Sequence, residues 1–133
     1  MNRMEWSRMR RLLVARPDNL GDVLLCSPAL RTIKHHLGDA HVTLLASPGG
    51  SRAAALLPWV DDVLTWRPLW QDVDGRLPFD PRRELRLVAL LREGSYDAAV
   101  ILTSFAQSAL PLAYLCLLAG VPRRIGFFKE RCE

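Results

Sequence analysis

The sequence predicts a doubly wound α/β fold, which is a parallel sheet with helices on both faces and right-handed crossovers. Apolar runs of strand length alternate along the chain with segments of helical periodicity. The first run, at residues 12–15, leads through a polar turn at residues 16–22 directly into a helical pattern, which is the first unit of such a sheet. Half of the 133 residues are hydrophobic, which is enough for the core of one domain.

The first predicted unit is a strand at residues 11–15 and a helix that ends at Gly38. Ser27 and Pro28 have the pattern of a helix cap followed by a proline at the first helical position. We therefore expect the helix proper to begin at Pro28, after a short turn over residues 22–26. Apolar side chains recur at gaps of three and four residues and form one face of this helix. They are Val23, Cys26, Leu30, Ile33 and Leu37.

The second strand is expected at residues 41–46, where aliphatic and β-branched side chains dominate. The sequence Ser-Pro-Gly-Gly at residues 47–50 predicts a turn, and a short helix is expected after it at residues 51–57. A third strand is expected at residues 62–66. Residues 67–80 contain two prolines and a glycine, which indicates a loop.

Asp80 and Pro81 repeat the pattern of a cap and a first-turn proline, which predicts a helix that runs to about Glu93. A fourth strand is expected at residues 98–102 because the segment is short and wholly apolar. The helical pattern that follows it covers residues 105–119. This unit has the same order as the first one, so we expect its strand to join the same sheet.

A fifth strand is expected at residues 125–128, after four units of strand and helix. It lies five residues before the end of the sequence with no helix to cover it, so we expect an interrupted domain at residues 11–133. Residues 1–10 are interpreted as a basic N-terminal extension. No apolar stretch long enough for a secretory signal follows them.

The charge pattern argues against a nucleic-acid arm. The net charge of +4 comes almost entirely from arginine, since Lys34 and Lys129 are the only lysines, and no basic run is longer than two residues. Weak attraction to an anionic membrane surface stays open. The three cysteines are far apart and form no CxxC or Cys/His pattern, so we expect neither disulfides nor a metal site and infer a reducing, cytoplasmic environment.

Residues 98–121 carry no charge over 24 positions, which is long enough to span a bilayer. The competing interpretation is a buried strand, a polar turn and a helix. Polar residues and a proline cluster in the first half of the segment, which favours the strand and the turn. They are Thr103, Ser104, Gln107, Ser108 and Pro111.

The polar turn at residues 16–22 provides the candidate site. It follows the carboxyl end of the first strand, which is where open α/β sheets bind ligands. Most phosphate-binding loops have glycines at the mouth of the following helix, whereas this chain has Asp22 there, and it contains neither GxGxxG nor GxxxxGK[ST]. A carboxylate at this position indicates general-base chemistry. The alternative is that Asp22 only caps the helix, where the dipole favours a carboxylate by about 0.3–1 kcal/mol.

The sequence RPDNLGDVLLCSPALRTIK at residues 16–34 resembles the N-terminal motif of the ADP-heptose:lipopolysaccharide heptosyltransferases, which form glycosyltransferase family nine. Three later segments are similar to the same family in order and spacing. These are HVTLLASPGG at residues 41–50, VDDVLTW at residues 60–66, and the stretch from ELRL to RRIGF at residues 84–127. The resemblance covers about residues 11–128.

The resemblance implies a Rossmann-like acceptor domain, the first half of the two-domain GT-B architecture, with the C-terminal nucleotide-sugar domain absent from this chain. It implies an inverting glycosyltransferase that moves a sugar, such as heptose, from an ADP-sugar to a lipopolysaccharide or another cell-envelope glycan. The donor is a substrate, and no cofactor or metal is expected. We expect this chain alone to be inactive, cytoplasmic, and at most peripheral at the inner face of the cytoplasmic membrane.

Two alternatives stay open beside that interpretation. In the first, the chain is a non-catalytic α/β binding module. In the second, it is one half of a split enzyme that needs a C-terminal partner chain. A sugar or glycolipid acceptor is the expected ligand, and nucleic acid is not expected.

The resemblance assigns a role to Asp22, and the chemistry of the neighbouring residues suggests roles for three more. Asp22 matches the aspartate that acts as the general base, and Gly21 would let the backbone approach the acceptor closely. Asn19 would orient an acceptor hydroxyl, although a local turn contact is the alternative. Arg16 would pair with an anionic acceptor group. The alternative for Arg16 is an internal partner, either Asp18 or Asp22.

Two further acceptor-binding residues are expected after the fourth strand. Ser104 and Gln107 lie at the matching strand end and would line the same crevice, although Ser104 as a helix cap and Gln107 as a surface residue are the alternatives. The Asp-Val-Asp sequence at residues 72–74 resembles a metal-binding motif, but the calcium-loop pattern fails and a loop turn is the better interpretation. Packing is the expected role of three tryptophans near the third strand, with a sugar platform as the alternative. They are Trp59, Trp66 and Trp70.

Overall fold

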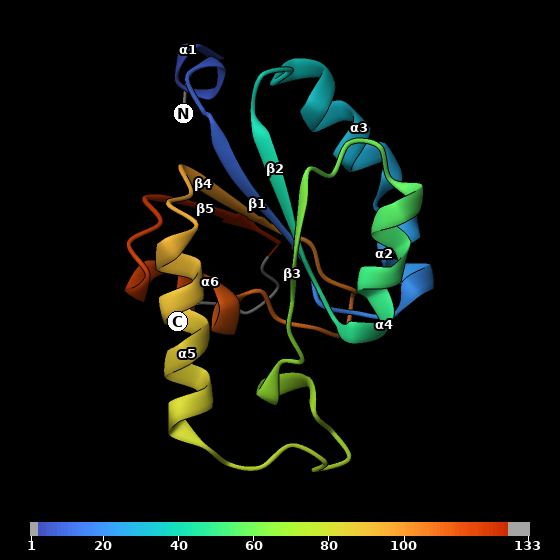
Figure 1. The fold of residues 1–133 in the computed structure, drawn as a ribbon, viewed down its shortest axis with the longest axis vertical. Helices are drawn as coiled ribbons and strands as arrows, with labels where there is room; N and C mark the ends of the chain where they lie inside the picture. The colour runs from blue at the N-terminus through green and yellow to red at the C-terminus, as the bar shows by residue number, and fades with distance from the viewer. Residues whose placement is uncertain (1–2, 128–133) are drawn as a thin grey trace.

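The computed structural model describes residues 3–127, and its centre is a sheet of five parallel strands (Figure 1). The strand order is β3-β2-β1-β4-β5, so the chain builds one half of the sheet outward from β1 and then the other half. This arrangement confirms the doubly wound α/β class. The strands are β1 (Arg11–Arg16), β2 (His41–Ala46), β3 (Asp62–Thr65), β4 (Ala98–Ile101) and β5 (Arg123–Gly126).

Strand β1 lies in the middle of the sheet and pairs with β2 on one side and β4 on the other. In the register, Arg16 is opposite Ala46 of β2, and Ala15 is opposite Ile101 of β4. The carboxyl ends of these strands therefore meet at one edge. The strand order reverses between β1 and β4, and such a reversal opens a crevice outside the strand ends.

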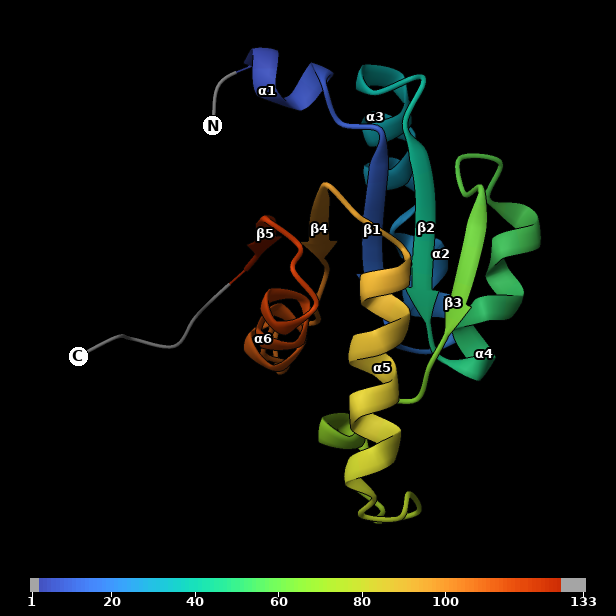
Figure 2. The same cartoon turned by 60° about the vertical axis from the view of Figure 1, so that its left-hand side comes forward.

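Helices cover both faces of the sheet (Figure 2). One face is covered by α2 (Leu20–Leu25), α3 (Ser27–His36), α4 (Pro48–Ser51) and the 3-10 helix η1 (Arg52–Leu56). The other face is covered by α5 (Pro81–Glu93) and α6 (Leu110–Leu118). A short helix α1 (Arg3–Ser7) precedes β1, within the segment expected as an extension.

The core has two halves because side chains of a strand alternate between the faces of the sheet. In β1, Leu12 and Val14 pack toward α2 and α3, whereas Leu13 and Ala15 pack toward α5 and α6; all four are completely buried. Burial on both faces explains why the central strands read as continuous apolar runs.

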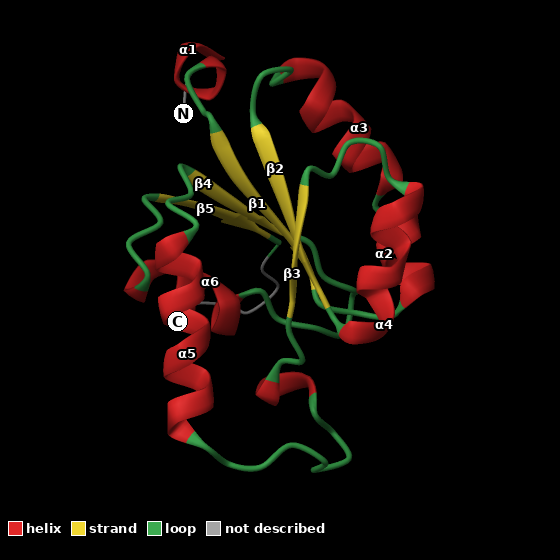
Figure 3. Ribbon diagram, in the orientation of Figure 1, coloured by secondary structure: helices red, strands yellow, loops and turns green. Residues whose placement is uncertain are grey.

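The connection from β3 to α5 is mostly loop with one short 3-10 turn, η2 (Leu69–Gln71), as Figure 3 shows. Two of the three tryptophans named above, Trp66 and Trp70, pack against the core beneath α5 and α6, and Trp59 packs against the other half. The guanidinium of Arg83 lies over the Trp66 ring, 4.4 Å from its centroid. The packing interpretation of these tryptophans is therefore confirmed.

The carboxylate of Asp61 joins α3 to the start of β2. It accepts a hydrogen bond from Lys34 Nζ at 2.5 Å and another from the backbone N–H of Val42 at 2.8 Å. Partial burial on its own raises the pKa of Asp61, but these two hydrogen bonds and the charge of Lys34 outweigh it. The pKa of Asp61 therefore lies below its ordinary value.

The expected turn at residues 22–26 and the expected cap at Ser27 are wrong. Residues 20–25 form α2, and only Cys26 separates it from α3, whose first residue is Ser27. Because the backbone before Ser27 is already helical, its hydroxyl donates back to the carbonyl of Leu24 at 2.5 Å and caps nothing. The Ser-Pro-Gly-Gly turn also differs, since Pro48 opens α4.

The cap at Asp80 is confirmed, since its carboxylate accepts the backbone N–H of Arg82 at 3.0 Å. The helix expected at residues 105–119 begins only at Leu110. The residues before it form a turn closed by two hydrogen bonds between Ser104 and Gln107. Strand β5 begins two residues earlier than expected, and residue 128 of that expectation lies outside the described residues.

The uncharged segment at residues 98–121 contains β4, the polar turn and α6, in the predicted order. Within residues 3–127, no helix combines the length and the apolar character that crossing a bilayer requires.

Candidate functional site

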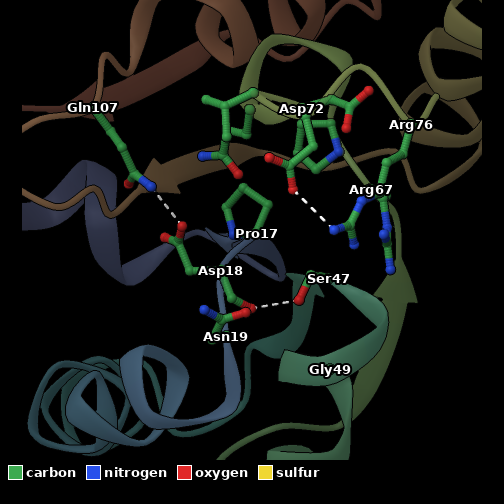
Figure 4. A pocket seen from close by; sticks show the side chains of 13 residues that line it. Pro17, Asp18, Asn19, Ser47, Gly49, Arg67, Asp72, Arg76 and Gln107 are labelled. Carbon is green, nitrogen blue, oxygen red and sulfur yellow. Dashed lines mark hydrogen bonds and ion pairs between the residues drawn. The ribbon is translucent and has the colours of Figure 1, made fainter.

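Loops that follow three neighbouring strands meet at the carboxyl edge of the sheet, and Asp18 joins them. Its carboxylate oxygen Oδ1 accepts a hydrogen bond from Gln107 Nε2 at 2.6 Å, across the boundary between β1 and β4. Its backbone carbonyl accepts one from Ser47 Oγ at 2.5 Å, after β2 (Figure 4). Ser47 also caps α4 by accepting the N–H of Gly50 at 3.0 Å. The three loops are therefore held in one fixed arrangement.

Arg16, the last residue of β1, lies beneath these loops and is only 7% exposed. Its Nη1 is 3.2 Å from Asp18 Oδ2, and its Nη2 donates to Ser104 Oγ at 2.9 Å. The same Nη2 lies 3.6 Å from Asp22 Oδ1. The structure therefore supports the alternative interpretation of Arg16, in which the guanidinium pairs with Asp18 and Asp22 inside the protein. Contact with an anionic acceptor stays a prediction for this residue.

Asp22 is the third residue of α2, and its side chain is 37% exposed. Asn19 occupies the N-cap position and makes no side-chain cap bond, while Asp22 lies in the first turn, where the helix dipole favours a carboxylate, so the alternative structural role of Asp22 stays open. Asp22 and Ser104 both contact the guanidinium of Arg16, so they lie at the same edge of the sheet. The geometry therefore leaves Asp22 accessible and held from one side, as a general base requires.

Two hollows flank these residues. The first has a volume of about 440 Å³ and lies over the loops that follow β1, β2 and β3 (Figure 4). The second has a volume of about 550 Å³ and lies over the ends of β4 and β5. Four of the six predicted site residues are divided between them: Asn19 and Gln107 line the first, whereas Arg16 and Asp22 line the second. Gly21 and Ser104 line neither hollow.

The first hollow is polar and contains groups of both charges. Arg67, Asp72 and Arg76 line it, opposite Asn19 and Gln107. Such a mixture of guanidinium, carboxylate and amide groups suits a ligand with many hydroxyl groups, since each hydroxyl both donates and accepts hydrogen bonds. The sequence analysis did not identify these loop residues as site residues. The sequence does carry a signal for these residues. A long loop of 14 residues with two arginines follows the third strand, at the carboxyl ends of the strands.

Asp72 also stabilises that loop. Its carboxylate accepts the backbone N–H of Leu77 at 2.7 Å, and its carbonyl accepts the N–H of Gly75 at 3.2 Å. Asp74 pairs with Arg76 at 3.2 Å, with both side chains mostly exposed. The loop-turn interpretation of this segment is therefore confirmed.

The second hollow is mainly apolar, with Asp22 and Arg16 at its polar end. Leu25, Ile125 and Phe127 are exposed in its wall. Cys26 also lines it, and burial raises the pKa of that thiol, so the protonated form dominates at neutral pH.

Two glycines of the site have different structural roles. A Cβ added at Gly50 would meet the carbonyl oxygen of Asp18 and would lie 2.8 Å from Val23 Cγ2, so glycine lets α4 approach α2 and the loop after β1. A Cβ at Gly21 would have no heavy atom within 4 Å. The fold does not require glycine at position 21, and its role in admitting the acceptor stays a prediction.

Two solved structures share this fold. The first is the Escherichia coli ADP-heptose LPS heptosyltransferase II, which matches with a TM-score of 0.65 and 22% identity over 87% of this chain and 30% of that chain. The second is the glycosyl transferase family 9 protein from Veillonella parvula DSM 2008, with a TM-score of 0.65 and 19% identity over 88% of this chain and 32% of that chain. No protein-family model and no curated protein matches the sequence. The chain spans about a third of each solved structure, and within that span it has the α/β fold of a family-nine glycosyltransferase.

Proposed function

We propose that this chain is the acceptor-side domain of an inverting glycosyltransferase. The sugar, heptose or a related sugar, comes from an ADP-sugar and is transferred to a hydroxyl of lipopolysaccharide or another cell-envelope glycan. The observation that carries the proposal is Asp22, a partly exposed carboxylate held beside the buried Arg16 at the point where the strand order reverses. The fold shared with two glycosyltransferases supports it.

In this proposal Asp22 is the general base. The acceptor hydroxyl attacks the anomeric carbon as Asp22 takes its proton, the bond to the diphosphate breaks, and ADP leaves with the electron pair. Attack from the face opposite the leaving group inverts the anomeric centre. Arg16 acts as a positioning residue, because its guanidinium lies 3.6 Å from the Asp22 carboxylate and is itself fixed by Asp18 and Ser104.

We propose that the acceptor glycan lies in the polar first hollow and extends past Arg16, which contacts both Asp18 in that hollow and Asp22 in the second, so that its reacting hydroxyl reaches Asp22. Asn19 and Gln107 line the first hollow, and both present amide groups to hydroxyls. The nucleotide-sugar is bound by a C-terminal domain, which we propose acts together with this chain in the cytoplasm, at the inner face of the cytoplasmic membrane. Such a domain would be supplied by a partner chain in a split enzyme.

Transfer assays with ADP-heptose and deacylated lipopolysaccharide test this proposal. The purified chain is expected to show no turnover alone and to gain it when the nucleotide-sugar half is added. In that mixture Asp22→Asn should lower turnover by roughly 10²–10⁴-fold, the usual contribution of a general base, without weakening acceptor binding. Asp39→Asn is the matched control, since Asp39 is exposed before the start of β2 and lines neither hollow. Turnover by the chain alone, or an unchanged rate for Asp22→Asn, would contradict the proposal.

A non-catalytic binding module is the second candidate, and one observation favours it. The first hollow is complete without Asp22, which lines the other hollow. Titration calorimetry with the deacylated glycan separates the two functions. Binding that Gln107→Ala weakens, with no turnover after the nucleotide-sugar half is added, assigns the module function.

A further inference from the structure

We propose that the outer surface of α5 and α6 binds the anionic surface of a lipid bilayer. This inference names a surface for the membrane placement given in the proposed function, and its test does not depend on Asp22 or on sugar transfer. Helices α5 and α6 cover one face of the sheet, whereas the two hollows lie at its carboxyl edge (Figure 2). Contact with a membrane through the helices would therefore leave the hollows accessible.

Helix α6 exposes an apolar stripe to solvent. It consists of Leu110 (48% exposed), Tyr114 (60%), Leu117 (51%) and Leu118 (46%). The spacing of four, three and one residues places these side chains on one side of the helix, while Leu112 on the other side is buried. Contiguous exposed apolar groups of this kind mark interaction sites.

Helix α5 supplies positive charge next to the apolar stripe. Arg82, Arg86 and Arg92 are exposed along it, and Glu93 at its end is the one exposed acidic residue of this fully described helix. Arg92 joins the two surfaces, because its Nη2 donates to the carbonyl of Leu118 at 3.1 Å, and Arg82 and Arg86 lie nearer the start of the same helix. Leucine, tyrosine and arginine side by side match a bilayer interface, which takes apolar groups below its headgroups and attracts arginine when its lipids are anionic.

The charge also argues for lipid over a second copy of this chain. A symmetric dimer formed through this surface would place two copies of the arginine-rich α5 at one interface, and like charges across an interface oppose association. An anionic lipid surface instead attracts each arginine by an amount that multiplies the binding constant roughly fivefold. The neighbouring β5 adds Arg124, which is exposed as well.

Sedimentation with vesicles of phosphatidylcholine, with and without phosphatidylglycerol, tests the proposal on the full chain. The chain is expected to bind the vesicles that contain phosphatidylglycerol, to release on addition of salt, and to leave pure phosphatidylcholine unbound. The double variant Arg82→Gln/Arg86→Gln should bind roughly thirtyfold more weakly, since each arginine contributes about fivefold. Leu117→Gln should weaken binding by about tenfold, because half of a leucine side chain no longer enters the bilayer.

Matched controls lie on the opposite helical layer. Arg31→Gln/Arg52→Gln removes the same charge from α3 and η1, and Leu56→Gln removes an exposed leucine from η1. Both should bind as the unmodified chain does. Equal losses in test and control variants, binding that ignores the lipid charge, or no binding at all would overturn the proposal. A concentration-dependent dimer in analytical ultracentrifugation that Leu117→Gln abolishes, without vesicle binding, would assign the stripe to protein contact instead.

Discussion

Replacing Arg16 by methionine tests how the site is held together. Methionine keeps most of the buried apolar stem and removes the guanidinium. The side chains of Arg16 and Asp18 are 8% and 9% exposed, with 3.2 Å between Nη1 and Oδ2. Without Arg16 the Asp18 carboxylate is buried with only Gln107 as a side-chain partner. Breaking a buried ion pair from one side costs about 3–5 kcal/mol of the free energy of unfolding.

Urea denaturation followed by tryptophan fluorescence measures this loss. Because a domain of this size has only about 5–15 kcal/mol of stability, a loss of that size shifts the midpoint well beyond error. Arg31→Met is the control, since Arg31 is exposed on α3, and it should change stability by less than about 0.5 kcal/mol.

A double-mutant cycle isolates the ion pair from other effects of the substitution. Asp18→Asn alone leaves the buried Arg16 with only the partly exposed Asp22 as a charged partner, whereas Arg16→Met/Asp18→Asn leaves no buried charge unpaired. The double variant should therefore lose clearly less stability than the sum of the single variants. A cost below about 1 kcal/mol for Arg16→Met, or additive costs in the double variant, would refute the argument that this buried pair supports the loops.

Three further predictions concern packing, pH and thiol chemistry. Gly50→Ala should lose about 1–3 kcal/mol in urea denaturation, because its Cβ meets the Asp18 carbonyl, whereas Gly21→Ala, with open space around its Cβ, should be neutral or stabilising; equal effects would contradict this. The pKa of Asp61 is lowered in the folded state, so its stabilisation is full above about pH 4 and is lost as the pH falls through the folded pKa. The difference in thermal midpoint between Asp61→Asn and the unmodified chain should therefore be large at pH 7 and small at pH 2, and a constant difference would argue against it. Burial raises the pKa of Cys116 to about 11, so iodoacetamide at pH 8 should label it, by peptide mass mapping, only after unfolding.

The sequence predicted the sheet well because each strand carries its own local signal. Residues 41–46 were predicted to the residue, and the start of α5 was predicted because Asp80 and Pro81 specify a helix start on their own. The turn expected at residues 22–26 is a helix because α2 packs against α4, a contact that local propensity does not contain. Ser104 does not cap α6 because the helix begins only at Leu110, and its hydroxyl instead accepts from Arg16, 88 positions away along the chain.

The sequence predicted where the candidate site lies, at the carboxyl ends of the strands, but not the contacts among its side chains. Parallel strands place the residues after β1 and β4 together whatever their side chains do, so the grouping of Asp22 with Ser104 followed from topology alone. The burial of Asp18 did not follow, because its partner Gln107 is 89 positions away and a turn-forming aspartate is usually exposed. The first hollow likewise depends on the path of the loop after β3. The sequence marks turns in that loop but does not predict its path.

The different burial of these residues decides which variants can test proton transfer separately from stability. Arg16 and Asp18 are buried and paired, so changing either one should disturb the loops after β1 and β4, and a loss of transfer would follow from the loss of structure. Asp22 is 37% exposed and lies 3.6 Å from its charged partner, so Asp22→Asn should keep stability within about 1 kcal/mol. A large loss of transfer with stability intact therefore assigns the proton transfer to this carboxylate. A parallel loss of stability would show instead that Asp22 belongs with Asp18 in holding Arg16.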